Sequence, residues 1–388
     1  MRRRELLCGL LGAGALLLVG CPQSQGDAKV IKIGVAGPFT GSAAAFGEMI
    51  RKAAELKIEE INAAGGIGGK KVEALFEDDR GDTTEAANVS RKLASDASVC
   101  LVIGHFNSTC SNAAKEEYNR KGVLQFSPGS TNVKVCAGSP WTFRNLYRDD
   151  FQGQLLARYS KDVLGAKKIA VFYDNDDYGK GLMEACKAEA DKIGLEVLDP
   201  ISYVRERTQD FKPLVEKVKG QAPDVIVICG LYNEAALIAK AARGDLGMQA
   251  PILGGDGVMN DKFIENAGKA AEGCYVFTPF LFDVVKDDPK AQAFYESFKK
   301  KFGKDPDTWA ALTYDAVGMA LQAVAEVGVD RKKIRDWMAS RTTPDKAYRG
   351  VTGPTYFDAE GDCYSKGLHV AVVKDGKFAA AEKQVKLN

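Results

Sequence analysis

Hydroxyl-bearing residues follow two neighbouring apolar segments of the sequence. Residues 104–109 (Gly-His-Phe-Asn-Ser-Thr) come after the first segment, and residues 127–131 (Ser-Pro-Gly-Ser-Thr) come after the second. If both segments are parallel strands of one sheet, these hydroxyls lie at its carboxyl edge, where open α/β sheets bind ligands. Taken singly, each motif is more often a helix cap or a turn. Together they favour a site for a carboxylate, which hydroxyls and free N–H groups bind well.

Small residues fill a third loop, residues 37–47, between a predicted strand and a predicted helix. Such a loop lets the backbone approach a ligand, and the helix start offers N–H donors to an anion. It matches neither G-x-G-x-x-G nor a Walker A motif, so a dinucleotide or nucleoside triphosphate is not indicated. A plain strand-to-helix connection explains this loop equally well.

Residue types for catalysis or metal binding are scarce. The histidines are His105 and His369 alone, which argues against a hydrolase triad or a histidine acid/base pair. Asp174, Asp176 and Gly179 resemble the start of a calcium loop, but an alanine stands where the bidentate glutamate belongs. No Cys/His spacing is typical of zinc. We therefore expect no metal, no cofactor and no enzymatic activity.

The amino-terminal segment has the pattern of an export signal. Three arginines, Arg2 to Arg4, precede an apolar run from Leu6 to Val19 that is too short to span a membrane as a helix. The run ends in Leu-Val-Gly-Cys, which looks like the bacterial lipobox, so we predict a signal peptide over residues 1–20 and acylation of Cys21. An ordinary signal peptide with an incidental cysteine is the alternative. Residues 21–28 are predicted to be a tether between lipid and domain.

Net charge and chain length narrow the classes of protein to which this sequence can belong. Removal of residues 1–20 takes away three arginines and one glutamate, so the formal charge falls from +1 to −1. No basic block suggests nucleic-acid binding, and no later stretch is apolar enough to span a bilayer. The remaining chain exceeds the usual size of one domain, so we expect two lobes.

The sequence has nine cysteines, of which Cys8 leaves with the signal and Cys21 takes the lipid. Seven remain, so at least one thiol stays unpaired within the chain. Cys100 and Cys229 lie in apolar runs and are expected to be buried and free. Cys110 and Cys136, expected in loops, are the better disulfide candidates, although the pairing stays open among Cys110, Cys136, Cys186, Cys274 and Cys363.

The elements that must position these residues alternate between strand and helix. Predicted strands cover residues 30–36, 71–76, 99–103, 123–126, 168–173, 197–201, 224–229 and 251–253. Predicted helices cover residues 46–63, 84–95, 151–163, 179–193, 211–219 and 234–242, with a longer helical region over 289–302 and 309–327. This alternation is typical of parallel sheets with crossover helices, and apolar strands indicate sheets covered on both faces. A predicted hairpin near the end, residues 368–374 and 377–385, suggests that the chain crosses between lobes more than once.

Several motifs together resemble one family. They are residues 33–41 (Ile-Gly-Val-Ala-Gly-Pro-Phe-Thr-Gly), 61–67 (Ile-Asn-Ala-Ala-Gly-Gly-Ile), 104–105, 127–131 and 177–179 (Asp-Tyr-Gly). With the lipobox, this set resembles the branched-chain amino acid-binding proteins of bacterial ABC importers. The resemblance implies the type I periplasmic binding protein fold, an α/β fold of two Rossmann-like lobes joined by three strands. By resemblance, residues 29–144 and 280–353 form the N-terminal lobe, and residues 145–279 and 354–388 form the C-terminal lobe.

The same resemblance implies roles for individual residues. The hydroxyls of Ser108 and Thr131 would bind the ligand carboxylate, and the carbonyl of Gly129 would accept from its ammonium. The resemblance also implies that the carboxylate of Asp256 pairs with the ammonium and that Tyr178 and Tyr232 contact the ligand from the second lobe. Phe46 and Trp309 would line the apolar pocket for the ligand side chain.

The sequence departs from the family pattern in three features. Many relatives have glutamate where this chain has Asp256, and two adjacent aromatics where it has Leu231 and Tyr232. A family disulfide is absent because its positions carry Gly81 and Asn107. Cys110 and Cys136 are hypothesised to replace it.

The resemblance implies a monomeric, membrane-anchored lipoprotein of the periplasm or cell surface. It would deliver a branched-chain or other neutral amino acid to the permease and ATPase of an ABC importer. Three alternatives remain open from the sequence: a ligand sensor that acts with a signalling receptor, an amide or aromatic acid as the ligand, and an enzyme of dehydrogenase type, against which export and the missing dinucleotide motif argue.

Overall fold

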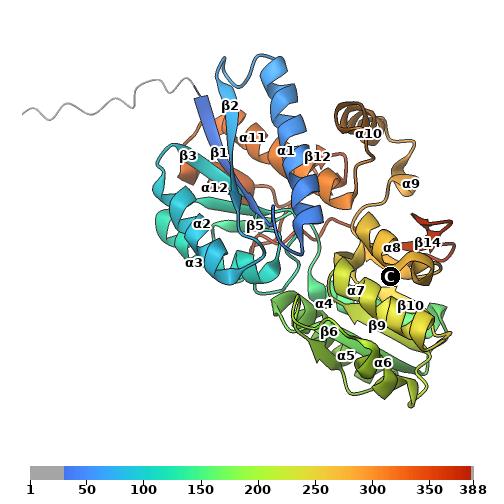
Figure 1. Ribbon diagram of the computed structural model, residues 1–388. Coiled ribbons are helices and arrows are strands. Elements are labelled where there is room, and N and C mark those ends of the chain that lie inside the picture. The colour runs from blue at the N-terminus through green and yellow to red at the C-terminus, as the bar shows by residue number, and fades with distance from the viewer. Residues whose placement is uncertain (1–29, 386–388) are drawn as a thin grey trace, which may run out of the picture.

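The computed structural model describes residues 30–385, which form two α/β lobes (Figure 1). The predicted signal peptide, the predicted lipid site Cys21 and the tether lie outside these residues. Among the described residues, no helix is long and apolar enough to cross a bilayer, and no cluster of acidic, histidine and cysteine side chains is suited to a metal ion. The predicted α/β fold class with parallel sheets and two lobes is confirmed.

The sheet of the first lobe has five parallel strands in the order β2-β1-β3-β4-β5. Their bounds are β1 (Val30–Gly37), β2 (Lys71–Asp78), β3 (Val99–Ile103), β4 (Leu124–Ser127) and β5 (Thr142–Arg144). β3 and β4 are buried along their whole length because helices cover both faces of the sheet.

The helices of this lobe are α1 (Ala44–Ala63), α2 (Thr83–Ser95), α3 (Ser108–Lys121), α10 (Pro289–Phe302), α11 (Thr308–Val327) and α12 (Arg331–Ala339), of which α10 packs on α1. α2 contacts α3, while α1 contacts α11, which in turn contacts α12. α11 is apolar on nearly every face because it is enclosed by the sheet, α1 and α12. Figure 1 places α11 beside β1 and α1, although it comes from the last quarter of the chain.

The sheet of the second lobe runs β15-β14-β11-β10-β9-β6-β7, with β8 also paired to β6. The strand bounds are β6 (Lys168–Asp174), β7 (Glu196–Val197), β8 (Ile201–Tyr203), β9 (Val225–Cys229), β10 (Ile252–Gly254), β11 (Tyr275–Thr278), β14 (His369–Lys374) and β15 (Lys377–Ala380). β6 to β11 pair in parallel, and the terminal hairpin β14–β15 adds antiparallel strands at one edge.

Helices cover both faces of the second sheet. α4 contacts α5, and α7 contacts α8. The helical elements are α4 (Asp149–Arg158) with π-helix η1 (Tyr159–Val163), α5 (Asp177–Ile193), α6 (Lys212–Lys219), α7 (Tyr232–Ala239) with π-helix η2 (Lys240–Asp245), 3-10 helix η3 (Asp256–Val258), α8 (Asp261–Ala267), 3-10 helix η4 (Gly268–Ala271) and α9 (Phe282–Val285).

The chain passes between the two sheets at three places. It leaves the first lobe after β5, returns between β11 and α10, and leaves again after the small two-stranded sheet of β12 (Tyr348–Gly350) and β13 (Gly353–Thr355). Figure 1 shows the two lobes joined by these passages, and connections of this kind are the usual hinge in two-lobed proteins.

Two expectations were wrong. The strand predicted over residues 197–201 is two short strands, β7 and β8, because Pro200 between them has no N–H for the ladder. All seven cysteines in the described residues are free and buried. The disulfide hypothesised for Cys110 and Cys136 is therefore absent, and Cys110 lies in the first turn of α3 instead of a loop.

Candidate functional site

The two sheets face each other at the edges where their strand order reverses. In the first sheet the reversal lies between the paired strands β1 and β3, and in the second sheet it lies between the paired strands β6 and β9. The loop after each of these strands opens into the space between the lobes, which is the usual ligand position in open α/β sheets. These loops carry the motifs that the sequence singles out.

The start of α3 points into this space. Asn107 precedes the helix in an extended conformation, and no side chain caps the first turn. The N–H groups of this turn therefore face the cleft together with the partial positive charge of the helix end. The hydroxyl of Ser108 accepts a hydrogen bond from the N–H of Asn132 at 3.2 Å, which joins α3 to the neighbouring ligand loop.

The loop after β4 is held by Ser127, whose hydroxyl accepts from the N–H groups of Gly129 at 3.3 Å and Ser130 at 2.9 Å. Gly129 is required sterically: a Cβ there would lie 2.3 Å from the ring of Phe106. The phenyl ring therefore covers the backbone of this loop, and any larger residue would displace the ring from the cleft.

A buried arginine supports the same loop from behind. The guanidinium of Arg144 donates to the carbonyls of Ser130 at 3.1 Å and Asn132 at 2.9 Å, and to the Asp362 carboxylate at 2.7 Å. The Ser130 carbonyl and the Thr131 N–H belong to one peptide group. A cation on the carbonyl oxygen polarises that N–H and makes it a stronger donor to an anion.

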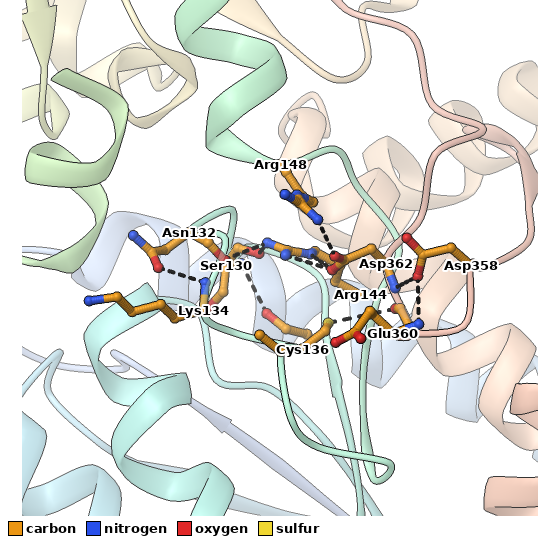
Figure 2. Close-up of polar contacts among 12 residues, drawn as sticks. Ser130, Asn132, Lys134, Cys136, Arg144, Arg148, Asp358, Glu360 and Asp362 are labelled. Atoms are coloured by element: carbon orange, nitrogen blue, oxygen red, sulfur yellow. Dashed lines mark hydrogen bonds and ion pairs between the residues drawn. The ribbon is translucent and has the colours of Figure 1, made fainter. Parts of the chain in front are cut away.

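Asp362 connects two passages between the lobes. It lies on the third passage and pairs with Arg144 at the end of β5 and, at 3.1 Å, with Arg148 at the start of α4 (Figure 2). Figure 2 shows the Asp362 carboxylate between the two guanidinium groups, with Ser130 and Asn132 on the far side of Arg144. The ligand loop, β5 and the third passage are therefore one polar unit.

On the opposite wall, Asp256 is 1% exposed at the start of η3. The Tyr178 hydroxyl donates to its Oδ1 at 2.8 Å and accepts from the N–H of Gly257 at 3.0 Å. The other oxygen, Oδ2, has no hydrogen-bond partner among residues 30–385. Burial raises the pKa of Asp256 to about 6, while the hydrogen bond from Tyr178 opposes the rise.

A second buried acid, Asp149, lies at the start of α4 and is 1% exposed. Neither of its carboxylate oxygens makes a hydrogen bond of good geometry in the described residues, and the same is true of the Tyr147 hydroxyl. The Thr131 side chain nevertheless lies close enough to lower the pKa of Asp149, and Asp256 lies close enough to raise the pKa of Tyr147. Burial, followed by the negative charge of Asp256, raises the pKa of Asp149 well above its usual value. No sequence motif marks Asp149, because an aspartate in the first turn of a helix is common for its favourable interaction with the helix dipole alone.

Aromatic rings form the apolar wall. Phe46 stacks on Phe106 with ring centres 4.6 Å apart, and both rings meet Trp309 edge to face at 5.7 Å and 4.9 Å. The indole N–H of Trp309 donates to the carbonyl of Met259 at 3.0 Å, which fixes the ring. Phe106 was not predicted, although it lies within the Gly-His-Phe-Asn-Ser-Thr motif.

These groups surround one small cavity. It is lined by Phe106, Asn107, Ser108, Gly129, Tyr178, Leu231, Asp256, Gly257 and Trp309. Five predicted site residues are thus brought together: Ser108, Gly129, Tyr178, Asp256 and Trp309. Of the other three, Phe46 lies behind Phe106 and Trp309, and Thr131 lies beyond Ser108 in the supported loop. Leu231 lines the cavity, whereas the neighbouring Tyr232 does not.

Hydrogen bonds across the cleft hold the lobes closed on each other. Tyr232 donates through its hydroxyl to the carbonyl of Ser42 at 2.6 Å, and Asn233 donates to the same carbonyl at 2.8 Å. Beside the cavity, the Asn132 amide donates to the carbonyl of Asp177 at 2.6 Å. Each of these bonds joins a residue of one lobe to a residue of the other, so separation of the lobes would break them all.

The family model described as "Periplasmic binding protein" matches residues 30–377, which is most of the chain. The chain belongs to the periplasmic binding protein family. The Leu/Ile/Val-binding protein homolog 1 of Brucella suis is 34% identical over 93% of this chain and 93% of its own length. A leucine-, isoleucine-, valine-, threonine- and alanine-binding protein of Pseudomonas aeruginosa is 30% identical over 90% of this chain and 91% of its own length.

Among solved structures, the branched-chain amino acid transporter substrate-binding protein LivJ of Streptococcus pneumoniae, in complex with isoleucine, is similar to this chain with a TM-score of 0.84. It is 34% identical and covers 92% of this chain and 100% of its own. The family resemblance inferred from the loop motifs is confirmed by these matches.

Proposed function

We propose that this protein binds a free α-amino acid as a zwitterion between its two lobes. The observation that carries the proposal is the buried carboxylate of Asp256, which lines the cavity with its Oδ2 unpaired among the described residues, opposite an uncapped helix start with the hydroxyl of Ser108. The second buried acid, Asp149, adds negative charge close to Asp256. Buried charges need a partner, and an ammonium group is the partner that fits the carboxylates. A carboxylate on the same ligand fits the helix start.

Each end of the zwitterion then has a defined set of contacts. The ligand carboxylate accepts from the hydroxyl of Ser108, from Thr131 and from the N–H groups of the first turn of α3. The ammonium donates to the Gly129 carbonyl and to the free Oδ2 of Asp256, with Asp149 as a second acceptor. Aspartate is shorter than the glutamate that many relatives have at this position, so the carboxylate of Asp256 lies farther from the ammonium group than a glutamate would. The second carboxylate, Asp149, adds negative charge that offsets this distance.

Closure of the lobes completes the site. Asp256 and Tyr178 come from the second lobe, whereas Ser108 and Gly129 come from the first, so neither lobe holds the full set. Closing the lobes excludes water, which strengthens each charge-assisted hydrogen bond. The contacts of Ser42 with Tyr232 and Asn233 then keep the lobes together.

The remaining wall is neutral and favours a neutral ligand side chain. Phe106, Leu231 and Trp309 line the cavity and have no charge to pair with a charged side chain. The relatives bind ligands of this kind by their printed descriptions: isoleucine for the Streptococcus protein, and leucine, isoleucine, valine, threonine and alanine for the Pseudomonas protein. A branched-chain or other small neutral amino acid is therefore the proposed ligand.

The proposed biological role is delivery of this amino acid to the permease and ATPase of an ABC importer. The family match supports a location outside the cytoplasm. Attachment to the membrane through acylated Cys21 rests on the Leu-Val-Gly-Cys sequence at residues 18–21. In this proposal residues 21–28 serve as the tether predicted from the sequence, and the lipidated protein acts as a monomer.

The direct test is a thermal-shift screen of the purified mature protein against the proteinogenic amino acids, followed by calorimetry on those that stabilise it. A bound ligand raises the melting temperature in proportion to the logarithm of its concentration over Kd. We expect a response to neutral amino acids, and none to the same compounds with the amino group acetylated. Binding that survives acetylation would contradict the ammonium site at Asp149 and Asp256.

A further inference from the structure

The apolar end of the ligand cavity is closed by aromatic rings that touch one another. The ring of Phe106 has its centre 4.6 Å from that of Phe46 and 4.9 Å from that of Trp309. Aromatic rings at these separations are in van der Waals contact. All three side chains are buried, and Phe106 and Trp309 form the inner surface of the wall. The end of the cavity that would receive a ligand side chain is therefore filled by packed rings.

Neither neighbour of Phe106 can withdraw to make room for it. The indole N–H of Trp309 donates to the carbonyl of Met259 at 3.0 Å, which ties this ring to the second lobe. Phe46 belongs to α1, whose start is packed tightly on the loop before it: a Cβ on Gly47 would lie 2.1 Å from a carbonyl oxygen of that loop. The ring of Phe106 is therefore wedged between two rings that are themselves fixed.

Phe106 also lies directly against the backbone that is proposed to bind the ammonium group. A Cβ on Gly129 would lie 2.3 Å and 2.7 Å from two atoms of the phenyl ring. From the opposite lobe, the side chain of Leu231 reaches so far that a Cβ on Gly257 would lie 2.8 Å from it. The cavity between these groups measures about 20 Å³, which is room for about one water molecule. A ligand side chain can therefore be accommodated only if part of the apolar wall moves.

We propose that Phe106 limits the length of the ligand side chain, so that the protein prefers amino acids with side chains of about one or two carbons, such as alanine. The inference rests on the proposed amino-acid function and deepens it. Phe106 comes from the same lobe as Ser108 and Gly129, so its distance from the ligand is the same whether the lobes are open or closed. A longer side chain has to displace a buried, close-packed ring, which is unfavourable in a dense interior.

The straight-chain series alanine, α-aminobutyrate, norvaline and norleucine tests this directly, because its members share both charged groups and each is one CH₂ longer than the last. In a pocket with free space, each added CH₂ tightens binding about fourfold. We expect calorimetry on the unaltered mature protein to give the lowest Kd for alanine or α-aminobutyrate, and a Kd at least about tenfold higher for norleucine. A Kd that falls steadily along the series would overturn the inference, and this comparison needs no variant to fold.

Phe106→Leu makes the wall smaller and keeps it apolar. We expect the Kd for norleucine to fall about tenfold in this variant, while the Kd for alanine changes by less than about threefold. The preferred length in the series should therefore shift toward longer side chains.

Phe298→Leu is the matched control. Phe298 is equally buried in the first lobe, but it lies on α10, where its ring packs on Phe294 and Phe302 away from the cavity. This variant should leave the ratio of the Kd values for norleucine and alanine unchanged. If Phe106→Leu also leaves the ratio unchanged, Phe106 has only a structural role and the inference is overturned.

The same measurements separate this inference from the proposed function. Tighter binding of leucine or norleucine than of alanine by the unaltered protein would reject the length limit and leave the proposed function intact. Binding of no amino acid would reject both.

Discussion

Replacement of Asp256 by asparagine is expected to make the protein more stable and its ligand binding weaker. The substitution preserves shape, and the amide oxygen still accepts from the Tyr178 hydroxyl that now donates to Oδ1. What disappears is a negative charge on a side chain that is 1% exposed and whose Oδ2 has no partner in the described residues. This buried charge destabilises the ligand-free protein, and the same charge binds the ammonium group of the ligand.

The size of the stability gain follows from the pKa. Burial raises the pKa of Asp256 from 3.8 to about 6. A shift of roughly two units corresponds to about 3 kcal/mol of preference for the neutral form in the folded state. Asparagine mimics that neutral form, so Asp256→Asn should raise the free energy of unfolding by up to about 3 kcal/mol at pH 7.5.

The stability gain is lost as the pH falls through a defined window. The folded pKa lies above the unfolded value, so the native state takes up a proton first as pH falls through about 6. Below that pH the wild-type aspartate is already neutral, and the advantage of the variant should shrink toward zero near pH 4. Urea denaturation of the ligand-free proteins at pH 7.5, 6 and 4.5 measures this difference directly. Asp191→Asn, at an exposed position of α5, is the control and should change stability little at any pH.

Binding should move in the opposite direction. Loss of a charged acceptor for the ammonium group costs roughly 1.5–3 kcal/mol, or about tenfold to a hundredfold in Kd. Calorimetry at pH 7.5 with the tightest amino acid from the screen gives this value. A variant that is less stable than wild type at pH 7.5, or that binds with unchanged Kd, would refute the assignment of Asp256 as an unpaired charge awaiting a cation.

Three further predictions concern other parts of the molecule. Asp362→Asn leaves the buried guanidinium of Arg144 without its counter-ion, so we expect a loss of about 3–5 kcal/mol in unfolding free energy by urea denaturation, with weaker ligand binding; unchanged stability would show that the pair is not buried in solution. Tyr232→Phe removes a hydrogen bond to Ser42 that exists only between closed lobes, so stopped-flow kinetics should show ligand release several-fold faster with an unchanged association rate; a change confined to association would contradict this role. Cys21→Ala should move the protein from the membrane fraction to the soluble fraction after cell lysis, and retention at the membrane would rule out lipidation at that residue.

The regular elements were largely predictable because their signals are local. Strand β3 and helix α10 lie where the sequence places them, at residues 99–103 and 289–302, because an apolar run and a helical period each need only neighbouring residues. Strand β5 is not among the strands predicted from the local pattern, since its three residues are too short for any periodicity. It nevertheless carries Arg144, whose partner Asp362 lies 218 positions away.

The sequence alone determined which loops matter. The Gly-His-Phe-Asn-Ser-Thr and Ser-Pro-Gly-Ser-Thr motifs at the ends of apolar strands indicated a carboxylate site, because strand ends in a parallel sheet converge wherever the rest of the chain goes. The lipobox at Cys21 and the family resemblance likewise depend on adjacent residues only.

Tertiary structure decided everything that depends on which distant groups become buried together. Asp149 and Asp256 are ordinary acids in the sequence, and only the packing of α4 against the start of η3 removes both from water and leaves Oδ2 of Asp256 and both oxygens of Asp149 without a hydrogen bond of good geometry in residues 30–385. The same packing places Leu231 in the cavity and turns Tyr232 toward Ser42. Burial and pairing are properties of the folded chain, because they depend on contacts between residues that the sequence separates by dozens to hundreds of positions.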